Sequence, residues 1–199
     1  MGSRVGHTAV AGRQHARRLF ICALIVAMTG GLTLADSFSG PRVDVTETGG
    51  VYRVTATFAV SESPDAVMAV LTDYERIPTY MPDMEISRVI ERTPGGMLVE
   101  QQAVSKFMLF SKRVHLLLNV REGEGTIHFS DRCGESFTTY AGSWIVSQHD
   151  SLTVVDYELT ATPTFEVPAF VLTRLLKRDS AQLIDRITVE ITARANRRK

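Results

Sequence analysis

The residue types that most often carry chemistry are few in this sequence and lack the spacing that the chemistry requires. After residue 35, the histidines are His115, His128 and His149, and the cysteine is Cys133. None of these histidines has metal-ligand spacing with another histidine, cysteine or carboxylate, so no metal site is predicted. Cys133 and the serines lack a motif that would position a base beside them, so no catalytic nucleophile is predicted.

The glycines and the charge balance exclude two further classes of site. Gly95-Gly96, and Gly123 with Gly125, are typical of hairpin turns rather than of a phosphate-binding loop. The chain has 22 basic and 22 acidic residues, and four of the basic residues fall within the first 35 positions. The remainder carries a net charge of −4. Its basic cluster is a short tail, Arg194, Arg197, Arg198 and Lys199, and such a charged tail is usually just solvated. We predict no cofactor and no nucleic-acid partner.

Residues 1–35 have the pattern of a secretory signal peptide. Arginines precede the apolar run LFICALIVAM, and the small residues Thr33 and Ala35 precede the predicted cleavage site. Residues 19–34 are interrupted by two glycines and are fewer than the roughly 20 that a spanning helix needs. We predict export to the periplasm or the extracellular space, with membrane association if the signal is not cleaved. Arg17-Arg18 leaves the general secretory and twin-arginine routes both open, and cleavage leaves Cys133 without a disulfide partner.

The rest of the chain is predicted to be an α+β domain. Residues 36–50 are interpreted as a polar lead-in with room for a short strand at 42–46, and residues 196–199 as a basic tail. A helix capped by Ser63 and opened by Pro64 should stop before Pro78, after a short turn at 73–77. The predicted strands are 51–60, 85–92, 97–105, 113–122, 126–131, 138–148 and 152–162. A long helix follows Pro168, with an apolar stripe over roughly 25 residues, or about 37 Å.

The stretch AVLTDYERIPTYMPDMEISRVIERT begins as a helix and ends as a strand. In between, Pro78 and Pro82 flank an apolar corner that contains Tyr80 and Met81. Prolines often simply stop helices, but they also fix a sharp turn without exposing unpaired backbone donors. We predict that this corner turns the chain back onto the edge of the sheet and forms the rim of a pocket.

A hairpin is predicted around the two-residue loop Gly123-Glu124. This loop places Val120 opposite Ile127 on an apolar face that should look inward. The outer face then carries His115 and His128, which do not lie opposite each other.

Three pieces of the sequence resemble the START-like, SRPBCC superfamily of helix-grip domains. They are FAVSESPDAVMAVLTDYERIPTYMP, then GSWIV with TVVDYELTATP, then FEVPAFVLTRLLKRDSAQLIDRITVEI. The closest likeness is to the polyketide cyclase/dehydrase and coenzyme-Q-binding families. The resemblance covers residues 51–195 and implies a curved antiparallel sheet of about six to seven strands around a long C-terminal helix, with short helices after the first strand. It also implies that the proline corner borders a ligand cavity and that the final helix covers it.

This resemblance, together with the missing catalytic motifs, predicts an exported binding protein for an apolar small molecule such as a lipid, an isoprenoid quinone or a polyketide-like compound. The residues predicted to line the cavity are Phe58, Tyr80, Met81, Leu116, Leu118, Phe129, Tyr140, Trp144, Tyr157, Phe170, Leu176 and Leu183. A cyclase- or dehydratase-type enzyme is an alternative, with Asp131, Glu100 and Tyr157 as its candidate polar groups. A ligand-free interaction module is another, because fold alone does not decide function.

The segment SKFMLFSKR could contact a membrane. Its apolar residues Phe107, Met108, Leu109 and Phe110 lie between basic residues, where one strand is expected to pass into the next. If the two strands simply run longer, half of these side chains face the core. If they form a hairpin tip, they could dock weakly and reversibly on an anionic bilayer.

Overall fold

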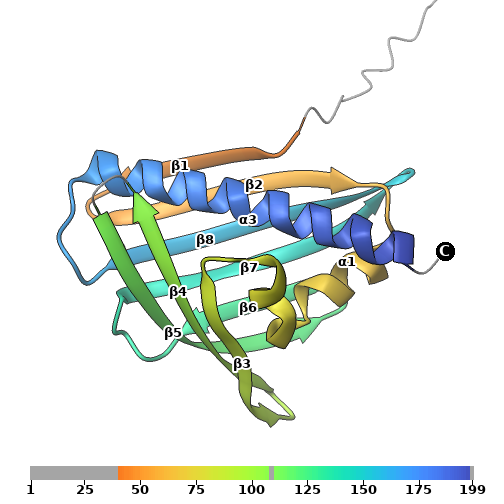
Figure 1. The fold of residues 1–199 in the computed structure, drawn as a ribbon, viewed down its shortest axis with the longest axis horizontal. Helices are drawn as coiled ribbons and strands as arrows, with labels where there is room; N and C mark the ends of the chain where they lie inside the picture. Colours follow the sequence, from red (N-terminus) through yellow and green to blue (C-terminus); the bar gives the residue numbers. More distant parts are fainter. Residues whose placement is uncertain (1–39, 108–109, 198–199) are drawn as a thin grey trace, which may run out of the picture. The chain divides into compact units, whose positions relative to one another are not determined.

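Alternating apolar side chains fold eight strands into one curved antiparallel sheet, and a long C-terminal helix crosses the sheet (Figure 1). The structure is a computed structural model that describes residues 40–107 and 110–197, without the side chains at 106, 107 and 110. The strand order is β1-β2-β8-β7-β6-β5-β4-β3. The strands are β1 (Arg42–Thr48), β2 (Val51–Val60), β3 (Met84–Thr93), β4 (Gly96–Phe107), β5 (Phe110–Gly123), β6 (Thr126–Asp131), β7 (Phe137–His149) and β8 (Leu152–Pro163). The predicted α+β helix-grip arrangement is confirmed.

The sheet has eight strands, whereas about six to seven were predicted. The short strand anticipated at 42–46 in the lead-in is β1, which pairs with β2 along its whole length. Gly49 and Gly50 form the turn between these strands, with φ of 59° and 82°. Two consecutive positive φ values are what a tight hairpin turn needs, so the glycine pair marks a hairpin and not a loose segment.

The helical elements are α1 (Pro64–Leu71), η1 (Tyr74–Arg76), α2 (Ile77–Tyr80) and α3 (Ala169–Arg197). The Ser63 hydroxyl accepts a hydrogen bond from the Ala66 amide, so the predicted cap is confirmed. The predicted stop before Pro78 is confirmed, because α1 ends at Leu71 and the short turn η1 follows within 73–77. The separate helix α2, which has Pro78 in its first turn, was not predicted. Proline suits that position, where its missing N–H leaves no helical hydrogen bond unmade.

The predicted register of the β5–β6 hairpin is wrong by two residues. The two-residue loop lies one position later, at Glu124-Gly125, so Val120 lies opposite Phe129 instead of Ile127. Gly125 has a φ of 64°, and a Cβ atom there would lie 2.7 Å from the Val146 carbonyl oxygen. Because the shift is even, every side chain keeps its predicted face. The inward apolar face is therefore confirmed, but the predicted cross-strand pairs between β5 and β6 are not.

The core lies between the sheet and α3. Helix α3 packs against β1, β2 and α1, and its most deeply buried residues are Ile184 and Ile191, at 0 % and 1 % exposed. Arg197, predicted to belong to a tail, is the last residue of α3. In the described part of the chain, no helix has the length and apolar character needed to cross a membrane.

Candidate functional site

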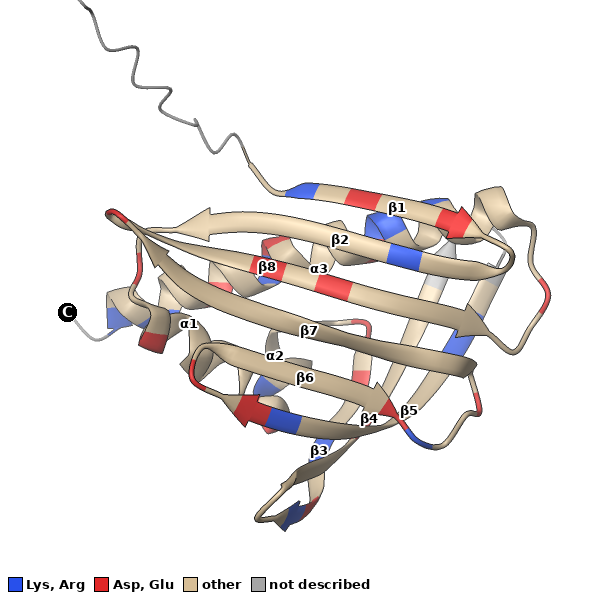
Figure 2. Ribbon diagram, turned by 180° about the vertical axis from the view of Figure 1, so that it is seen from behind, with Lys and Arg blue, Asp and Glu red and all other residues tan. Residues whose placement is uncertain are grey.

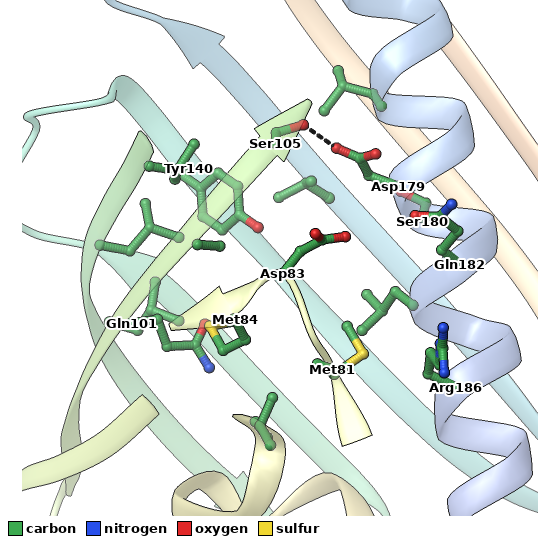
Figure 3. A pocket seen from close by; sticks show the side chains of 18 of the residues that line it. Met81, Asp83, Met84, Gln101, Ser105, Tyr140, Asp179, Ser180, Gln182 and Arg186 are labelled. Atoms are coloured by element: carbon green, nitrogen blue, oxygen red, sulfur yellow. Dashed lines mark hydrogen bonds between the residues drawn. The ribbon is translucent and has the colours of Figure 1, made fainter. Parts of the chain in front are cut away.

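A cavity of about 550 Å³ lies between the sheet and α3 and is partly open to solvent. Strands β4 to β8 supply one wall, α3 supplies the opposite wall, and the segment from Tyr74 to Met84 supplies the rim. Figure 3 shows side chains from β4, from α3 and from the rim pointing into the same space. The proline corner therefore borders a cavity.

Ten of the twelve side chains predicted to line the cavity do so: Tyr80, Met81, Leu116, Leu118, Phe129, Tyr140, Trp144, Tyr157, Leu176 and Leu183. Phe58 does not, because it is packed into the filled core at 3 % exposed. Phe170 does not either, and it is 69 % exposed. It lies two residues, or about 200° of helical rotation, before the cavity-lining Leu172 and so faces the opposite way.

Aromatic side chains form much of the wall on the sheet side. The ring centroids of Trp144 and Tyr157 are 4.3 Å apart, and those of Phe129 and Tyr140 are 6.0 Å apart. Gly142 makes room for this packing, since a Cβ atom there would lie 2.7 Å from the Phe129 ring. This aromatic part of the wall is consequently apolar apart from its tyrosine hydroxyls and indole nitrogen, whereas β4 and β5 add the polar side chains of Gln101, Ser105 and Lys112.

The hydroxyls of Tyr140 and Tyr157 are hydrogen-bonded to each other. Burial raises the pKa of Tyr140 to about 12 and also raises the pKa of Tyr157. Both groups are therefore protonated at neutral pH. Two hydroxyl protons sharing one mutual hydrogen bond leave one proton that can be donated to another oxygen. This pair is the polar feature of the aromatic part of the wall.

The family model described as polyketide cyclase/dehydrase and lipid transport matches residues 60–188. This chain belongs to that family. Its fold is shared by a START superfamily protein from Mycobacterium smegmatis, with 15 % identity, a TM-score of 0.62, and coverage of 71 % of this chain and 97 % of that one. A STAR-related lipid transfer protein from Xanthomonas axonopodis has 14 % identity and a TM-score of 0.63, and the match covers 77 % and 94 % of the two chains.

A third structure in this fold group is the Zhui aromatase/cyclase from Streptomyces sp. R1128. It has 14 % identity and a TM-score of 0.61, with 73 % of this chain and 96 % of that chain covered. The search of curated proteins found no match. The predicted START-like, SRPBCC assignment is confirmed. The named activities of these structures differ, so the fold is consistent with ligand binding and with cyclase-type chemistry.

In this family member the helix side of the cavity is more polar than the sheet side. Figure 3 shows Asp83 from the rim and Asp179 from α3 pointing into the cavity, and the Ser105 hydroxyl donates a hydrogen bond to Asp179. Gln182 and Arg186 also line this side. The sequence reasoning missed these residues because it followed only apolar positions. The same helical spacing that predicted Leu176 and Leu183 also places Asp179 and Arg186 on that side of the helix.

The three candidate catalytic groups do not meet. Tyr157 lines the cavity, whereas Glu100 pairs with Arg88 and His115 outside the cavity lining. The Asp131 carboxylate accepts hydrogen bonds from backbone amides, including that of Leu117 at 2.8 Å. Burial opposes the charge on Asp131, but these amide bonds prevail and lower its pKa. Asp131 is thus a structural acceptor rather than a base facing the cavity.

The rim is tied to the end of α3 by Arg194. Its guanidinium lies 2.8 Å from Asp73 and 2.7 Å from Glu190, and it donates to the Ala69 carbonyl at 3.1 Å. Arg194 was predicted to belong to a basic cluster that is merely solvated, yet its side chain is only 13 % exposed. Beside it, the Tyr74 hydroxyl donates to Glu122 at 2.7 Å, and burial raises the pKa of Tyr74. These contacts fix the proline corner at the cavity mouth.

The predicted membrane-docking residues are Phe107, Met108, Leu109 and Phe110, at the predicted tip of the β4–β5 hairpin. Met108 and Leu109 lie outside the described residues. For Phe107 and Phe110 the backbone pairing of β4 with β5 is described, which shows that the two strands continue to the tip. The docking hypothesis stays a prediction.

Proposed function

We propose that this family member binds an apolar or amphipathic small molecule in the cavity under α3 and acts as a binding or carrier protein. The observation that carries the proposal is the cavity of about 550 Å³ with its aromatic and aliphatic wall. Ligand pockets typically measure about 300–1,000 Å³ and combine an apolar lining with a few polar groups. The family description, which includes lipid transport, and the named lipid transfer protein from Xanthomonas support the same class of ligand.

The polar groups favour a ligand that carries a neutral oxygen. Tyr140 and Tyr157 are protonated donors, and burial of an unpaired hydroxyl is costly, so a ligand carbonyl or hydroxyl oxygen would satisfy the remaining proton. Asp83 and Asp179 share the lining with the cations Lys112 and Arg186, so the charged groups do not by themselves select an anionic ligand. Lipids with hydroxyl or carbonyl groups, quinones and polyketide-like molecules fit this description.

The enzyme alternative has weaker support. Of its three candidates only Tyr157 lines the cavity, and the raised pKa values of Tyr157 and Tyr140 make them donors rather than bases at neutral pH. The interaction-module alternative needs a filled core, which the cavity argues against. Export remains part of the proposal, supported by the pattern of residues 1–35, and the N-terminal sequence of the secreted protein tests it.

The decisive experiment is native mass spectrometry of the protein purified from its own host, followed by extraction of any bound molecule. Trp144 is the single tryptophan of the chain and lines the cavity, so its fluorescence reports binding of an added apolar probe. Ala103→Phe inserts a ring at a lining position and should reduce probe binding at least tenfold. Thr55→Phe adds the same ring at an exposed position of β2 and should leave binding unchanged. Ligand-free protein, with equal probe binding by both variants, would overturn the proposal.

A further inference from the structure

Three side chains with metal-binding atoms meet away from the cavity. His115 lies on β5, and Cys133 and Glu135 lie in the loop that follows β6. One ligand atom from each residue lies within 4.8 Å of the other two, and His115 Nδ1 is 2.8 Å from Glu135 Oε2. The neighbours of His115 along β5, Val114 and Leu116, both line the cavity. His115 therefore points to the opposite face of the sheet, the face seen in Figure 2.

The backbone builds this cluster without help from the three side chains. The Arg132 amide donates to the Leu117 carbonyl at 3.0 Å, so the chain after β6 stays against β5. The Asp131 carboxylate then accepts from the Gly134 amide at 3.0 Å, and the His115 amide donates to the Ser136 hydroxyl at 3.1 Å. The loop is thus fixed at both ends. A bound ion would leave these loop contacts in place and would replace the hydrogen bond that the Cys133 thiol donates to Asp131 at 3.2 Å.

We propose that His115, Cys133 and Glu135 form a binding site for a zinc-type divalent transition-metal ion. Imidazole nitrogen, thiolate sulfur and carboxylate oxygen are the three ligand types that zinc takes in proteins, at about 2.0–2.3 Å. A thiolate ligand disfavours Mg²⁺ and Ca²⁺, which prefer oxygen atoms only. Ligand atoms within 4.8 Å of one another can reach these bond lengths through side-chain rotation. Three protein ligands leave a fourth tetrahedral position for water.

A second layer of contacts fits the same assignment. His115 Nε2 lies 3.2 Å from Glu100 Oε1, and the other carboxylate oxygen of Glu100 lies 2.6 Å from Arg88. A metal-binding histidine usually donates its second ring N–H to a carboxylate, which fixes the tautomer and the orientation of the ring. Here Glu100 would accept from Nε2, leaving Nδ1 to face the ion, Cys133 and Glu135. The His115 side chain is 25 % exposed, so an ion can reach it from solvent.

The sequence does not predict this site, because its ligands come from two elements. Cys133 and Glu135 are two residues apart, and the imidazole is contributed from β5, which the β6 hairpin and its loop bring alongside. The competing interpretation is an ion-pair network of His115 with Glu100 and Glu135. That network contains no metal–sulfur bond, and this difference makes the proposal testable.

The test uses the full chain, reduced and freed of metal by a chelator that is then removed. Cobalt(II) is added, and the ultraviolet charge-transfer band of a cobalt–thiolate bond is recorded. Zinc affinity is measured in competition with a chromophoric chelator. We expect one equivalent of cobalt to produce the band, zinc to abolish it, and Mg²⁺ and Ca²⁺ to leave it unchanged.

Variants assign the band to the site. Cys133→Ser should remove the cobalt–thiolate band. Glu135→Gln should weaken zinc binding at least tenfold. Glu100→Gln should weaken zinc binding about 10–100-fold and keep the band. His128→Gln, at an exposed position of β6, and Cys22→Ser are the matched controls and should change nothing. Circular dichroism verifies that each variant is folded, and Glu135→Gln, at an exposed loop position, decides the question if Cys133→Ser does not fold. Absence of the band in the native chain, or its persistence in Cys133→Ser, overturns the proposal.

Discussion

The two halves of α3 serve different purposes although they belong to one continuous helix. In the C-terminal half, Ile184, Ile187 and Ile191 are almost fully buried, and Arg194 binds the rim through Asp73. In the N-terminal half, the cavity-lining side chains are the half-buried Leu175, Leu176 and Leu183, the fully buried Leu172 and Ser180, and the polar Asp179. The cavity extends along α3 as far as Ile187, whereas Ile184 and Ile191 do not line it and fill the core.

This difference shows how a small domain can keep a cavity and remain folded. A void deprives the residues around it of packing contacts, so a cavity costs stability wherever it lies. The packing of α3 against β1, β2 and α1, and the contacts of Arg194 with Ala69 and Asp73 near its C-terminal end, hold the helix in place without help from a ligand. The N-terminal half can therefore present an incompletely packed face to the cavity. Truncating a side chain that fills the core should therefore cost more stability than truncating one that lines the cavity.

The largest effect is expected for Ile184→Ala in the filled half. Ile184 is 0 % exposed, and truncation of a buried aliphatic side chain to alanine costs about 2–5 kcal/mol. The matched variant Leu176→Ala lines the cavity and should cost roughly 1–1.5 kcal/mol, because part of its surface has no packing partner to lose. Urea unfolding monitored by circular dichroism gives both free energies. Equal losses for the two variants would contradict the division of α3 into two halves.

The next largest effect is expected for Arg194→Met. This change removes the more buried of the two arginines that pair with each of Asp73 and Glu190, which should cost about 2–4 kcal/mol. Arg197→Met is the control, because Arg197 pairs with the same Glu190 but is 58 % exposed. Exposed pairs contribute about 0–1 kcal/mol, so its thermal midpoint should barely move. A similar loss in both variants would show that the charge of the tail, and not the rim contact, is what stabilises the domain.

The stability conferred by Arg194 should depend on pH. Burial opposes the charge on Glu190, but the hydrogen bond and charge of Arg194 prevail, so the pKa of Glu190 lies below its ordinary value of 4.5. A lowered pKa means that the stabilisation is fully present above about pH 4.5 and is lost as the pH falls through the folded-state pKa. The difference in unfolding free energy between the native chain and Arg194→Met should narrow between pH 5 and pH 3. Urea unfolding of both proteins at a series of pH values measures this difference. If the difference in unfolding free energy stays constant from pH 5 to pH 3, the ion pair with Glu190 does not contribute to stability.

The comparison of the two halves also explains what the sequence could predict. The apolar stripe of α3 and the alternation of the strands are local patterns, so ten cavity residues followed from them once the fold was recognised. The filled and hollow halves of α3 carry the same kind of stripe. Leu183 and Ile184 are neighbours in the same stripe, about 100° apart around the helix axis. Which of them meets the cavity and which meets the filled core depends on where the sheet lies, and that position is a tertiary property.

Contacts between distant elements were missed for the same reason. Arg194 looked like part of a solvated tail because its partner Asp73 lies more than a hundred residues earlier in the chain. The β5–β6 register was predicted two residues away from its true value because either glycine of Gly-Glu-Gly could have formed the turn. The close approach of Gly125 to Val146 on β7 decides between them, and no local signal contains that contact.

The smallest effect is expected for Phe170→Ser, which tests where the cavity wall begins. Phe170 is apolar and lies in the first turn of α3, so the sequence predicted it as a lining residue, yet it is 69 % exposed. Exposed substitutions usually change stability by less than about 0.5 kcal/mol. The variant should therefore keep both its unfolding midpoint and its affinity for the apolar probe read by Trp144 fluorescence. Leu172→Ser, two residues later and 2 % exposed, should lower both. Loss of probe binding in Phe170→Ser at unchanged stability would place Phe170 at the entrance of the cavity and extend the hollow half of α3 to its first turn.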